Sequence, residues 1–386
     1  MRTFRQRFGH EAQATFEAPG RVTLMGGHTD YNDGFVLPCA IEHRVAIAAS
    51  PRTDSVVRMV AANFDGQESK FDLDVQIERD EAARWSNYVR GVANALHSRG
   101  FALQGVDMTI SGDVPLGAGL SSSAALEIAA ATLFARFNDL DVDGTTLAQV
   151  GQEAENDFVG VRCGIMDQLT AVFGQRDHAL LIDCRSLEVR PVRIPDGYSV
   201  VFANSNVRRD LLDSEFNTRR AQCEAAAAHC GVEALRDLDM RDLDRGTAGL
   251  DEVSIRRARH VITENQRTLD AARALVEGDL VRMGELMAAS HRSMRDDFES
   301  TVPAVDGLVE IIGDVIGAEG GVRMTGGGFG GCVVGLVPTP MVAEIRAAVE
   351  RRYPVVTGLQ ATVYVCRAGE GSAAARAPGP RPSGCG

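Results

Sequence analysis

The order of the predicted secondary structure favours an α+β fold built from two domains. Strand-like and helical segments follow one another in mixed order, not in the regular βαβα alternation of a doubly wound parallel sheet. The chain has 386 residues, which at about 100–200 residues per domain favours two domains over one. With 45% hydrophobic and 24% charged residues, its composition is that of a globular protein.

Short apolar runs bounded by Gly, Pro and Asp predict the strands. They are residues 15–25, 34–41, 44–50, 55–62, 105–112, 178–183, 187–194, 198–205 and 359–367, together with the two flanks of the glycine-rich stretch 321–337. Residues 115–120 form a Pro/Gly turn directly before three serines. Gly and Pro residues of this kind mark the turns at which the chain reverses direction.

Helical periodicity marks the remaining elements. Trp85, Val89, Val92 and Leu96 recur at helical spacing, and Gly100 follows as a C-cap. The other predicted helices are an alanine-rich one that ends near residue 138 and those near 145–158, 164–173, 214–230, 254–277, 280–300, 304–316 and 342–351.

The turn at residues 195–197 is the predicted domain boundary. It divides the chain into an N-terminal domain, residues 1–195, and a C-terminal domain, residues 196–368. Residues 369–386 are rich in Gly, Ala, Pro and Ser and have no apolar period, so a disordered tail is expected there.

Charge and hydropathy exclude several classes of protein. The net charge of -13 argues against a broad nucleic-acid interface, which needs a basic face. The most hydrophobic helix candidate, residues 124–137, is interrupted by Glu127 and Arg136, so no membrane span is expected. The first residues lack the apolar core of a secretory signal.

Lysine and cysteine usage narrows the chemistry further. Of the 40 basic residues Lys70 is the only lysine, which argues against Schiff-base chemistry and against the P-loop lysine. The 8 cysteines form no CxxC pair, so neither a disulfide framework nor a structural zinc site is expected. A reducing, cytoplasmic location follows.

Three glycine-bearing segments could carry chemistry. Residues 115–125 (PLGAGLSSSAA) lie between a strand and a helix, where free N–H groups and the helix dipole suit phosphate. An ordinary glycine turn with a serine N-cap explains this segment equally well. In the segment 321–331, five glycines fall within the six positions 326–331, which suits a chain that closes over a ligand better than a flexible hairpin.

The third segment, residues 19–34, concentrates hydrogen-bonding groups in a strand and turn. Arg21, His28, Asp30, Asn32 and Asp33 suggest recognition of a polyol, although Asx residues and glycines also make simple turns.

Asp167 is a further candidate, a carboxylate at the start of an apolar helix twelve residues after Glu155. By itself Asp167 is better explained as an acid favoured by the helix dipole.

Taken together and in this order, the segments resemble the galactokinase branch of the GHMP small-molecule kinases. GRVTLMGGHTDYNDGFVLP is similar to the galactokinase signature, PLGAGLSSSAA to the family's phosphate loop, and RMTGGGFGGC to its third motif. A stretch within residues 204–223 resembles a further galactokinase-specific segment. The resemblance covers about residues 18–367. It implies two α+β domains with the active site in the cleft between them.

The resemblance also implies an activity: ATP- and magnesium-dependent phosphorylation of the anomeric hydroxyl of a sugar, most simply galactose. Asp167 corresponds to the general base and Arg21 to the cation beside it. Ser123 and Glu155 correspond to the magnesium ligands. The residues that correspond to the phosphate cradle are Gly117, Ala118, Gly119, Leu120, Ser121, Ser122 and Ser123. Those that correspond to the sugar contacts are Gly27, His28, Thr29, Asp30 and Phe216.

Two positions depart from the family pattern, which usually has glutamate at Gly27 and tyrosine at Phe216. Both changes fall in the expected sugar pocket, so a sugar altered at C6, galacturonate and then L-arabinose, is the alternative substrate. A catalytically inactive regulator that binds sugar and ATP is a third reading. The enzyme is favoured because all four catalytic and metal-binding positions are present: Asp167, Arg21, Ser123 and Glu155.

Overall fold

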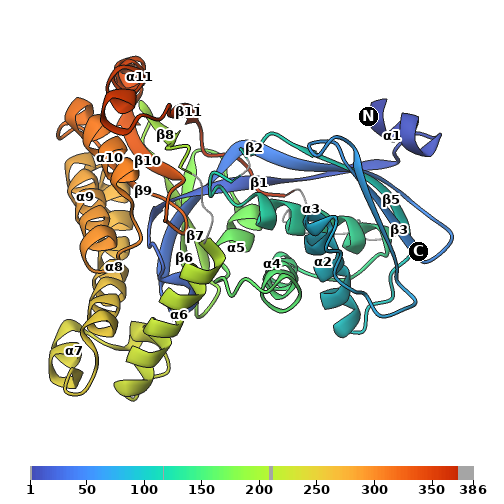
Figure 1. Cartoon of the computed structure of the whole chain (residues 1–386), viewed down its shortest axis with the longest axis horizontal. Helices are drawn as coiled ribbons and strands as arrows, with labels where there is room; N and C mark the ends of the chain where they lie inside the picture. Colours follow the sequence, from blue (N-terminus) through green and yellow to red (C-terminus); the bar gives the residue numbers. More distant parts are fainter. Residues whose placement is uncertain (1, 116, 208–211, 373–386) are drawn as a thin grey trace, which may run out of the picture.

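The computed structural model describes residues 2–115, 117–207 and 212–372. It consists of two β-sheets flanked by helices, with two long strands running across the molecule (Figure 1). The first sheet has seven strands, in the order β4-β3-β5-β2-β6-β7 with β1 paired to β2. Its strands are β1 (Ala14–Met25), β2 (Phe35–Pro51), β3 (Val56–Ala61), β4 (Gln67–Asp72), β5 (Val106–Gly112), β6 (His178–Asp183) and β7 (Val189–Arg193).

Helices from the first half of the chain pack beneath this sheet (Figure 1). They are α2 (Asn87–Ser98), α3 (Ser122–Phe137), α4 (Gly144–Glu153) and α5 (Met166–Phe173), and a π-helical turn (Ala154–Val159) continues α4. Helix α3 lies against β1 and β2 and is buried almost all round, which explains its alanine-rich composition. Small side chains allow close packing of a helix that is apolar on every side.

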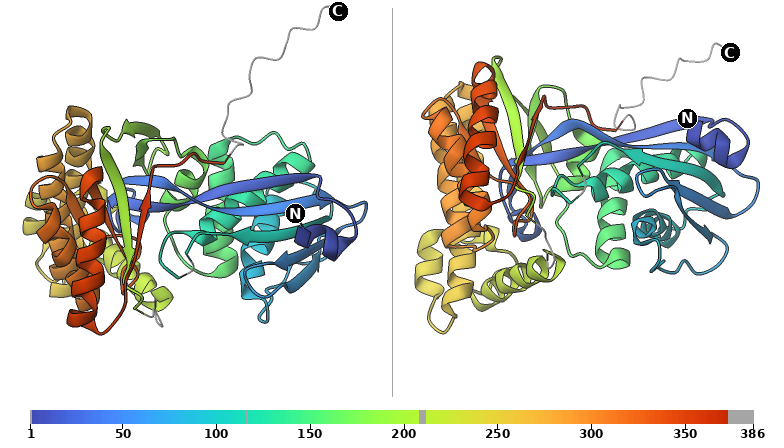
Figure 2. Two further views of the ribbon diagram at one scale, coloured as in Figure 1. Left: turned by 90° about the horizontal axis from the view of Figure 1, so that it is seen from above. Right: turned by 45° about the horizontal axis from the view of Figure 1, so that its top comes forward.

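The second sheet is antiparallel and has the order β11-β8-β10-β9. Its strands are β8 (Tyr198–Asn204), β9 (Gly321–Met324), β10 (Cys332–Pro338) and β11 (Thr362–Cys366). The helices of this half stack at the end of the molecule opposite α1 (Arg2–Phe8), as Figure 2 shows. They are α6 (Leu212–His229), α7 (Met240–Gly246), α8 (Glu252–Glu277), α9 (Leu280–Asp296), α10 (Pro303–Ile316) and α11 (Val342–Thr357).

One set of side chains of the second sheet shares the hydrophobic core of the first sheet, whereas the alternate residues of β8 and β10 pack in a separate core with α10 and α11. Val200 and Phe202 of β8, together with Cys332 and Leu336 of β10, belong to the same buried cluster as the first sheet. The first sheet ends at Arg193 and the second begins at Tyr198. The boundary near residue 196 stays a prediction, and this change of sheet supports it.

Several elements differ from the sequence-based predictions. The two strands expected at 34–41 and 44–50 form one strand, β2, because β1 pairs along almost its whole length. Helices α1 and α7 were not predicted. Helix α7 begins with a capping box of Asp239 and Asp242, a signal that outweighs its weak apolar pattern.

The tail predicted to be disordered from Gly369 needs correction at its start. Gly369 donates to Ala40 O, Gly371 to Gly174 O and Ser372 to Ala171 O, each at 2.8 Å. Glycine suits this path because a Cβ on Gly371 would lie 2.1 Å from Val172 O. Residues 373–386, the rest of the predicted tail, lie outside the described residues.

No helix of the described residues is long and apolar enough to cross a membrane. Cys332 of β10, the last residue of the RMTGGGFGGC motif, is fully buried in the hydrophobic core.

Candidate active site

The loop from residue 117 to Ser121 connects β5 with α3 and turns sharply. Gly117, Gly119 and Ser121 have positive φ angles of 69°, 77° and 57°. Helix α3 begins at Ser122, and among the described residues no side chain caps its N-terminus. The first N–H groups of α3 are therefore left for a ligand, and a helix N-terminus of this kind favours an anion. The geometry favours a phosphate loop over the simple serine cap that the sequence left open.

An ion pair between Arg21 and Asp167 lies beside this loop. Arg21 Nε and Nη2 donate to the two carboxylate oxygens of Asp167, each at 2.6 Å, so the pair is bidentate. Arg21 Nη1 donates to Gly119 O at 2.8 Å, and the Ser121 hydroxyl donates to Asp167. Because Arg21 belongs to β1 and Asp167 to the first turn of α5, the pair joins three separate segments around one carboxylate.

A cavity of about 630 Å³ opens at this ion pair and is lined by both halves of the chain. It brings together most of the positions singled out in the sequence. Its lining includes Arg21, Gly27, His28, Asp30, Gly117, Gly119, Leu120, Ser121, Ser122, Ser123, Glu155, Asp167 and Phe216.

Four residues that the sequence singled out do not line this cavity: Thr29, Asn32, Asp33 and Ala118. Thr29 is fully buried, and its hydroxyl donates to Gly26 O at 3.0 Å and to Phe35 O at 2.7 Å. The sugar contact of Thr29 stays a prediction, and in this structure its hydroxyl hydrogen is used to close the loop. Ala118 is also fully buried, and in the phosphate loop it contributes packing, not a side chain facing the cavity.

Glu155 lies in the π-helical turn and faces a second buried carboxylate. Gln168 Nε2 donates to Glu155 at 3.0 Å and to Glu127 at 2.9 Å. Burial and the nearby Asp167 charge raise the pKa of Glu155, although hydrogen bonds from Ser123, Cys163 and Gln168 oppose the shift. Carboxylates held together in this way favour a bound cation, which would relieve their repulsion. Glu127 was not singled out in the sequence because it reads there as a polar interruption of an apolar helix.

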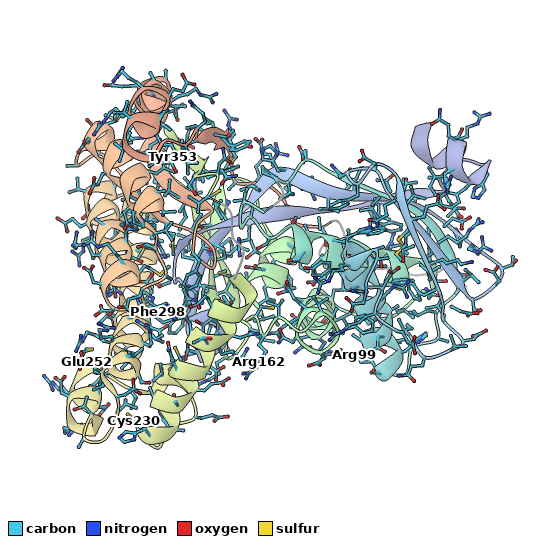
Figure 3. All side chains as sticks on the ribbon, viewed as in Figure 1. Arg99, Arg162, Cys230, Glu252, Phe298 and Tyr353 are labelled. Carbon is cyan, nitrogen blue, oxygen red and sulfur yellow. The ribbon has the colours of Figure 1, made fainter. Side chains whose placement is uncertain are left out.

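Aromatic side chains form one wall beside the predicted sugar loop. The His28 ring lies 5.5 Å from Phe216 and 4.5 Å from Phe298, measured between ring centroids. His28 Nδ1 hydrogen-bonds Tyr31 Oη at 2.9 Å, and among the described residues its buried Nε2 has no partner. Phe298 is fully buried, and Figure 3 shows it between α6 and the other helices of the second half of the chain. Phe298 and Tyr31 were not predicted, since lone aromatic residues carry no spacing signal.

The glycine-rich segment 321–331, which forms the turn between β9 and β10, closes the cavity from the second sheet. Thr325 Oγ1 accepts a hydrogen bond from Thr23 N at 2.8 Å, which ties the β9–β10 turn to β1. Gly326 has a φ of 77°, and a Cβ there would lie 2.9 Å from Gly119 O of the phosphate loop. The glycines therefore permit the close approach of two backbones, as their density in the sequence suggested.

A smaller apolar pocket of about 140 Å³ adjoins the phosphate loop. It shares Tyr88, Ser122 and Ser123 with the main cavity, and its other walls include Phe64 and Trp85. A flat aromatic ring attached to a phosphate chain would fit across the two pockets. In the sequence Trp85 is one position of an apolar helix face, so its place at a ligand pocket could not be read there.

The structure also shows what fills the space beside Gly27. A Cβ placed on Gly27 would lie 2.6 Å from Nη2 of Arg323 and 2.9 Å from Sδ of Met294. Arg323 is fully buried and is paired with Glu264, from Nη1 to Oε1, at 3.2 Å. The missing side chain therefore leaves no empty space, because two long side chains of the second half occupy it.

Comparisons with known proteins agree with this geometry. Residues 2–51 match the galactokinase galactose-binding signature, 87–175 the N-terminal domain of GHMP kinases, and 271–355 their C-terminal domain. A crystal structure of Lactococcus lactis galactokinase complexed with galactose is 37% identical, with a TM-score of 0.92, over 96% of this chain and 97% of that chain.

More distant structures share the fold. Methanococcus jannaschii mevalonate kinase is 16% identical, with a TM-score of 0.62 over 94% of this chain and 100% of that chain. Streptococcus pneumoniae phosphomevalonate kinase, in complex with phosphomevalonate and AMPPNP, is 12% identical, with a TM-score of 0.64 over 92% of this chain and 100% of that chain.

The two sheets, the uncapped helix N-terminus and the glycine turn that meets it define a small-molecule kinase of the GHMP class. The chain belongs to the galactokinase family within that class. It is accordingly a sugar kinase, a phosphotransferase with an alcohol as acceptor.

Proposed function

We propose that this chain transfers the γ-phosphoryl group of ATP to the anomeric hydroxyl of galactose, giving galactose 1-phosphate and ADP. One observation carries the proposal. The Arg21–Asp167 ion pair lies between the uncapped N-terminus of α3 and the loop of the galactose-binding signature, within a single cavity. A similar structure, that of Lactococcus lactis galactokinase, was determined as a complex with galactose.

In this proposal each group has a distinct role. The Asp167 carboxylate accepts the proton of the attacking hydroxyl, and Arg21 orients that carboxylate while adding positive charge near the reacting phosphoryl group. The first N–H groups of α3 and the loop from Gly117 to Ser123 hold the phosphates. Phosphoryl transfer depends mainly on such positioning and charge neutralisation, so the absence of a P-loop lysine is no obstacle.

Magnesium fits the residues present. Ser123 and Glu155 offer two oxygen donors on the same cavity wall, and Mg²⁺ commonly takes one or two protein oxygens together with phosphate oxygens and water. Among the described residues no group of three or more His, Cys, Asp or Glu side chains is arranged to hold a metal. The phosphates of ATP would complete the site, where the ion would neutralise phosphate charge.

Removal of either oxygen donor is expected to raise the magnesium requirement. For Glu155→Gln we expect a larger rise in the magnesium concentration that gives half-maximal rate than for Ser123→Ala, because Mg²⁺ is held mainly by charged carboxylate oxygens. The measurement is initial rate against magnesium concentration at saturating ATP and galactose. The matched control is Glu153→Gln, whose half-exposed side chain pairs with Arg99. An unchanged magnesium dependence in both variants would contradict the assignment.

The sugar specificity is tested by kcat/KM for galactose, galacturonate and L-arabinose, in the wild type and in Gly27→Glu. We expect the highest kcat/KM for galactose. Arg323 is already paired with the Glu264 carboxylate, so its charge is not left unpaired for a carboxylate at C6 of the sugar. Higher kcat/KM for galacturonate or L-arabinose would assign the alternative substrate. Binding of galactose and ATP without ADP release would instead indicate a regulator.

Asp30 makes the reaction dependent on pH. Burial, followed by the nearby Asp167 charge, raises the pKa of Asp30 to about 6. Its carboxylate is therefore ionised above that pH and can accept hydrogen bonds from sugar hydroxyls, whereas below it the group becomes protonated. We expect kcat/KM for galactose to fall about tenfold per pH unit below pH 6. In Asp30→Asn the part of this acid limb that Asp30 causes should disappear, leaving the titration of Glu155, whose pKa is also raised. A wild-type profile that is flat through pH 6 would remove Asp30 from sugar binding.

Cytoplasmic location and the absence of nucleic-acid partners stay predictions from the composition. The proposed ligands are the sugar, ATP and magnesium.

A further inference from the structure

The loop that carries the predicted sugar-binding residues is held from the other half of the chain by helix α8. Glu264 Oε1 accepts hydrogen bonds from the backbone N–H groups of Gly26 and Gly27, at 3.0 and 3.3 Å. His260, one turn earlier on α8, hydrogen-bonds the Gly27 carbonyl through Nε2 at 3.0 Å. The two peptide groups that flank the Gly27 Cα are therefore both held by side chains of one helix.

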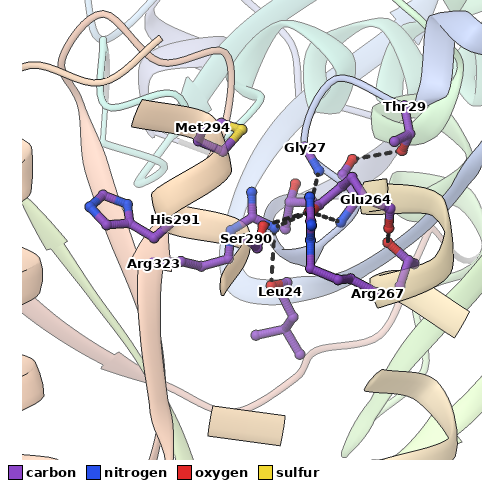
Figure 4. A network of polar contacts seen from close by, with 12 residues as sticks. Leu24, Gly27, Thr29, Glu264, Arg267, Ser290, His291, Met294 and Arg323 are labelled. Carbon is purple, nitrogen blue, oxygen red and sulfur yellow. Dashed lines mark hydrogen bonds and ion pairs between the residues drawn. The ribbon is translucent and has the colours of Figure 1, made fainter. Parts of the chain in front are cut away.

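Glu264 is itself fixed by a buried polar network (Figure 4). Its Oε1 accepts from the Ser290 hydroxyl at 2.6 Å and from Arg323 at 3.2 Å, and its Oε2 accepts from Arg267 at 2.7 Å. Burial alone would raise the pKa of Glu264, but the charges of Arg323 and Arg267 outweigh it and hold the pKa well below its usual range. An ionised carboxylate with no exposed surface is costly unless its partners are fixed, so this geometry is strongly determined.

His260 acts as a neutral donor. Burial lowers the pKa of His260 to about 4, so the ring carries one proton at neutral pH. Because the Gly27 carbonyl can only accept, that proton lies on Nε2, and Nδ1 lies 2.9 Å from Ser293 Oγ, whose hydroxyl also contacts Asp297 Oδ2. The ring also packs on Phe298, with 4.7 Å between centroids.

Neither Glu264 nor His260 lines the cavity, so both can act on the sugar only through the loop. Gly27 leads directly into His28, and Asp30 follows in the short 3-10 helix Asp30–Asn32. His28 and Asp30 do line the cavity. A shift of the Gly27 backbone would therefore move both of these side chains relative to Asp167.

The glycine at position 27 makes these backbone contacts decisive in this chain. The space that a side chain at this position would use is filled by Arg323 and Met294. The backbone around Gly27 is consequently held by hydrogen bonds from α8, together with the one from the Thr29 hydroxyl to Gly26 O. Among the described residues, the far end of the loop is held similarly, because Asn265 Oδ1 accepts from Phe35 N at 2.9 Å.

We propose that Glu264 and His260 are positioning residues for the sugar: they set the backbone of the loop at Gly26 and Gly27, and through it the side chains that bind the sugar hydroxyls. The inference rests on the proposed galactose kinase function. It assigns no chemical step to either residue, and ATP binds on the far side of the cavity, against α3.

The first test is Glu264→Gln, which keeps the shape of the side chain and removes its charge. We expect KM for galactose to rise about tenfold or more, while KM for ATP and kcat change by less than about threefold, since only ground-state sugar contacts are displaced. Glu277→Gln, at the exposed end of the same helix, is the matched control and should behave as wild type. Calorimetric titration with galactose alone gives the same comparison without turnover.

A second pair of variants covers the case in which Glu264→Gln fails to fold. His260→Phe retains the ring on Phe298 but loses the hydrogen bond to Gly27, whereas His260→Gln retains an N–H donor of similar reach. We expect His260→Phe to raise KM for galactose at least about fivefold and His260→Gln to restore most of it.

Two results would overturn the inference: unchanged galactose affinity in folded Glu264→Gln or in His260→Phe, or equal losses for galactose and ATP. These results are distinct from failure of the proposed function, in which the wild-type protein would not phosphorylate galactose at all.

Discussion

Replacing Asp167 with asparagine is expected to lower kcat by about 10²- to 10⁴-fold, the usual contribution of a positioned general base. Asparagine has nearly the same volume, but its amide cannot take the proton of the attacking hydroxyl. The change also removes the bidentate partner of the Arg21 guanidinium. In the wild type, Nε and Nη2 each lie 2.6 Å from one carboxylate oxygen of Asp167. ATP affinity should be nearly unchanged, because the phosphates are held at α3. The measurements are kcat with saturating galactose and ATP, and ATP affinity by calorimetry.

Asp157→Asn is the control for this variant. Asp157 belongs to the π-helical turn that also carries Glu155, but its side chain is exposed, so both kcat and ATP affinity should stay at wild-type values. Turnover near the wild-type rate in Asp167→Asn would remove this carboxylate from the catalytic role. The helix-dipole explanation of Asp167 would then be sufficient.

Replacing Arg21 with methionine is the second change with a large expected effect. Arg21 is only 6% exposed and connects Asp167 with Gly119 of the phosphate loop. We expect kcat to fall about 10²- to 10³-fold through loss of positive charge near the reacting phosphoryl group. We also expect the free energy of unfolding to fall by about 1.5–3 kcal/mol, since charge-assisted hydrogen bonds are lost. Kinetics and denaturant unfolding measure the two effects separately.

Arg21→Lys separates charge from geometry. An ammonium restores the positive charge but cannot reach both carboxylate oxygens and Gly119 O in one plane, so it should recover only part of the lost rate. The control is Arg190→Met, which removes an exposed ion pair between Arg190 of β7 and Glu188. It should change neither kcat nor the free energy of unfolding appreciably. Full activity in Arg21→Met would show that Asp167 needs no cationic neighbour.

The sequence predicted the mixed fold and most element types, because apolar periodicity is a local property. Helices α8, α9 and α10 begin within two residues of their predicted starts. The merging of two predicted strands into β2 was not predictable, since it depends on the pairing partner β1 and not on the residues between the runs. Helix α11 passes Pro354, at which a local rule would end it, and continues to Thr357.

For the site, the sequence named the segments but not their contacts. Arg21 and Asp167 are 146 positions apart, and Thr23 and Thr325 are 302 apart, so no spacing rule connects them. The resemblance to galactokinases indicated that they meet, and the tertiary structure shows the atoms involved. Thr29 illustrates the opposite case: it lies within the predicted sugar motif, yet its hydroxyl closes the loop instead of facing the cavity.

Several segments that, in order, resemble the galactokinase motifs determined the class of this protein from sequence alone, because phosphate binding uses backbone geometry that glycines and a serine-rich helix start encode locally; no single segment was sufficient. Tertiary structure alone decided how the sugar loop is held. Glu264, His260 and Arg323 are each unremarkable in sequence, and they acquire a role only because folding buries them together against Gly27. Burial removes water as the competing hydrogen-bond partner, so these contacts, which have no local sequence signature, fix the backbone next to the sugar.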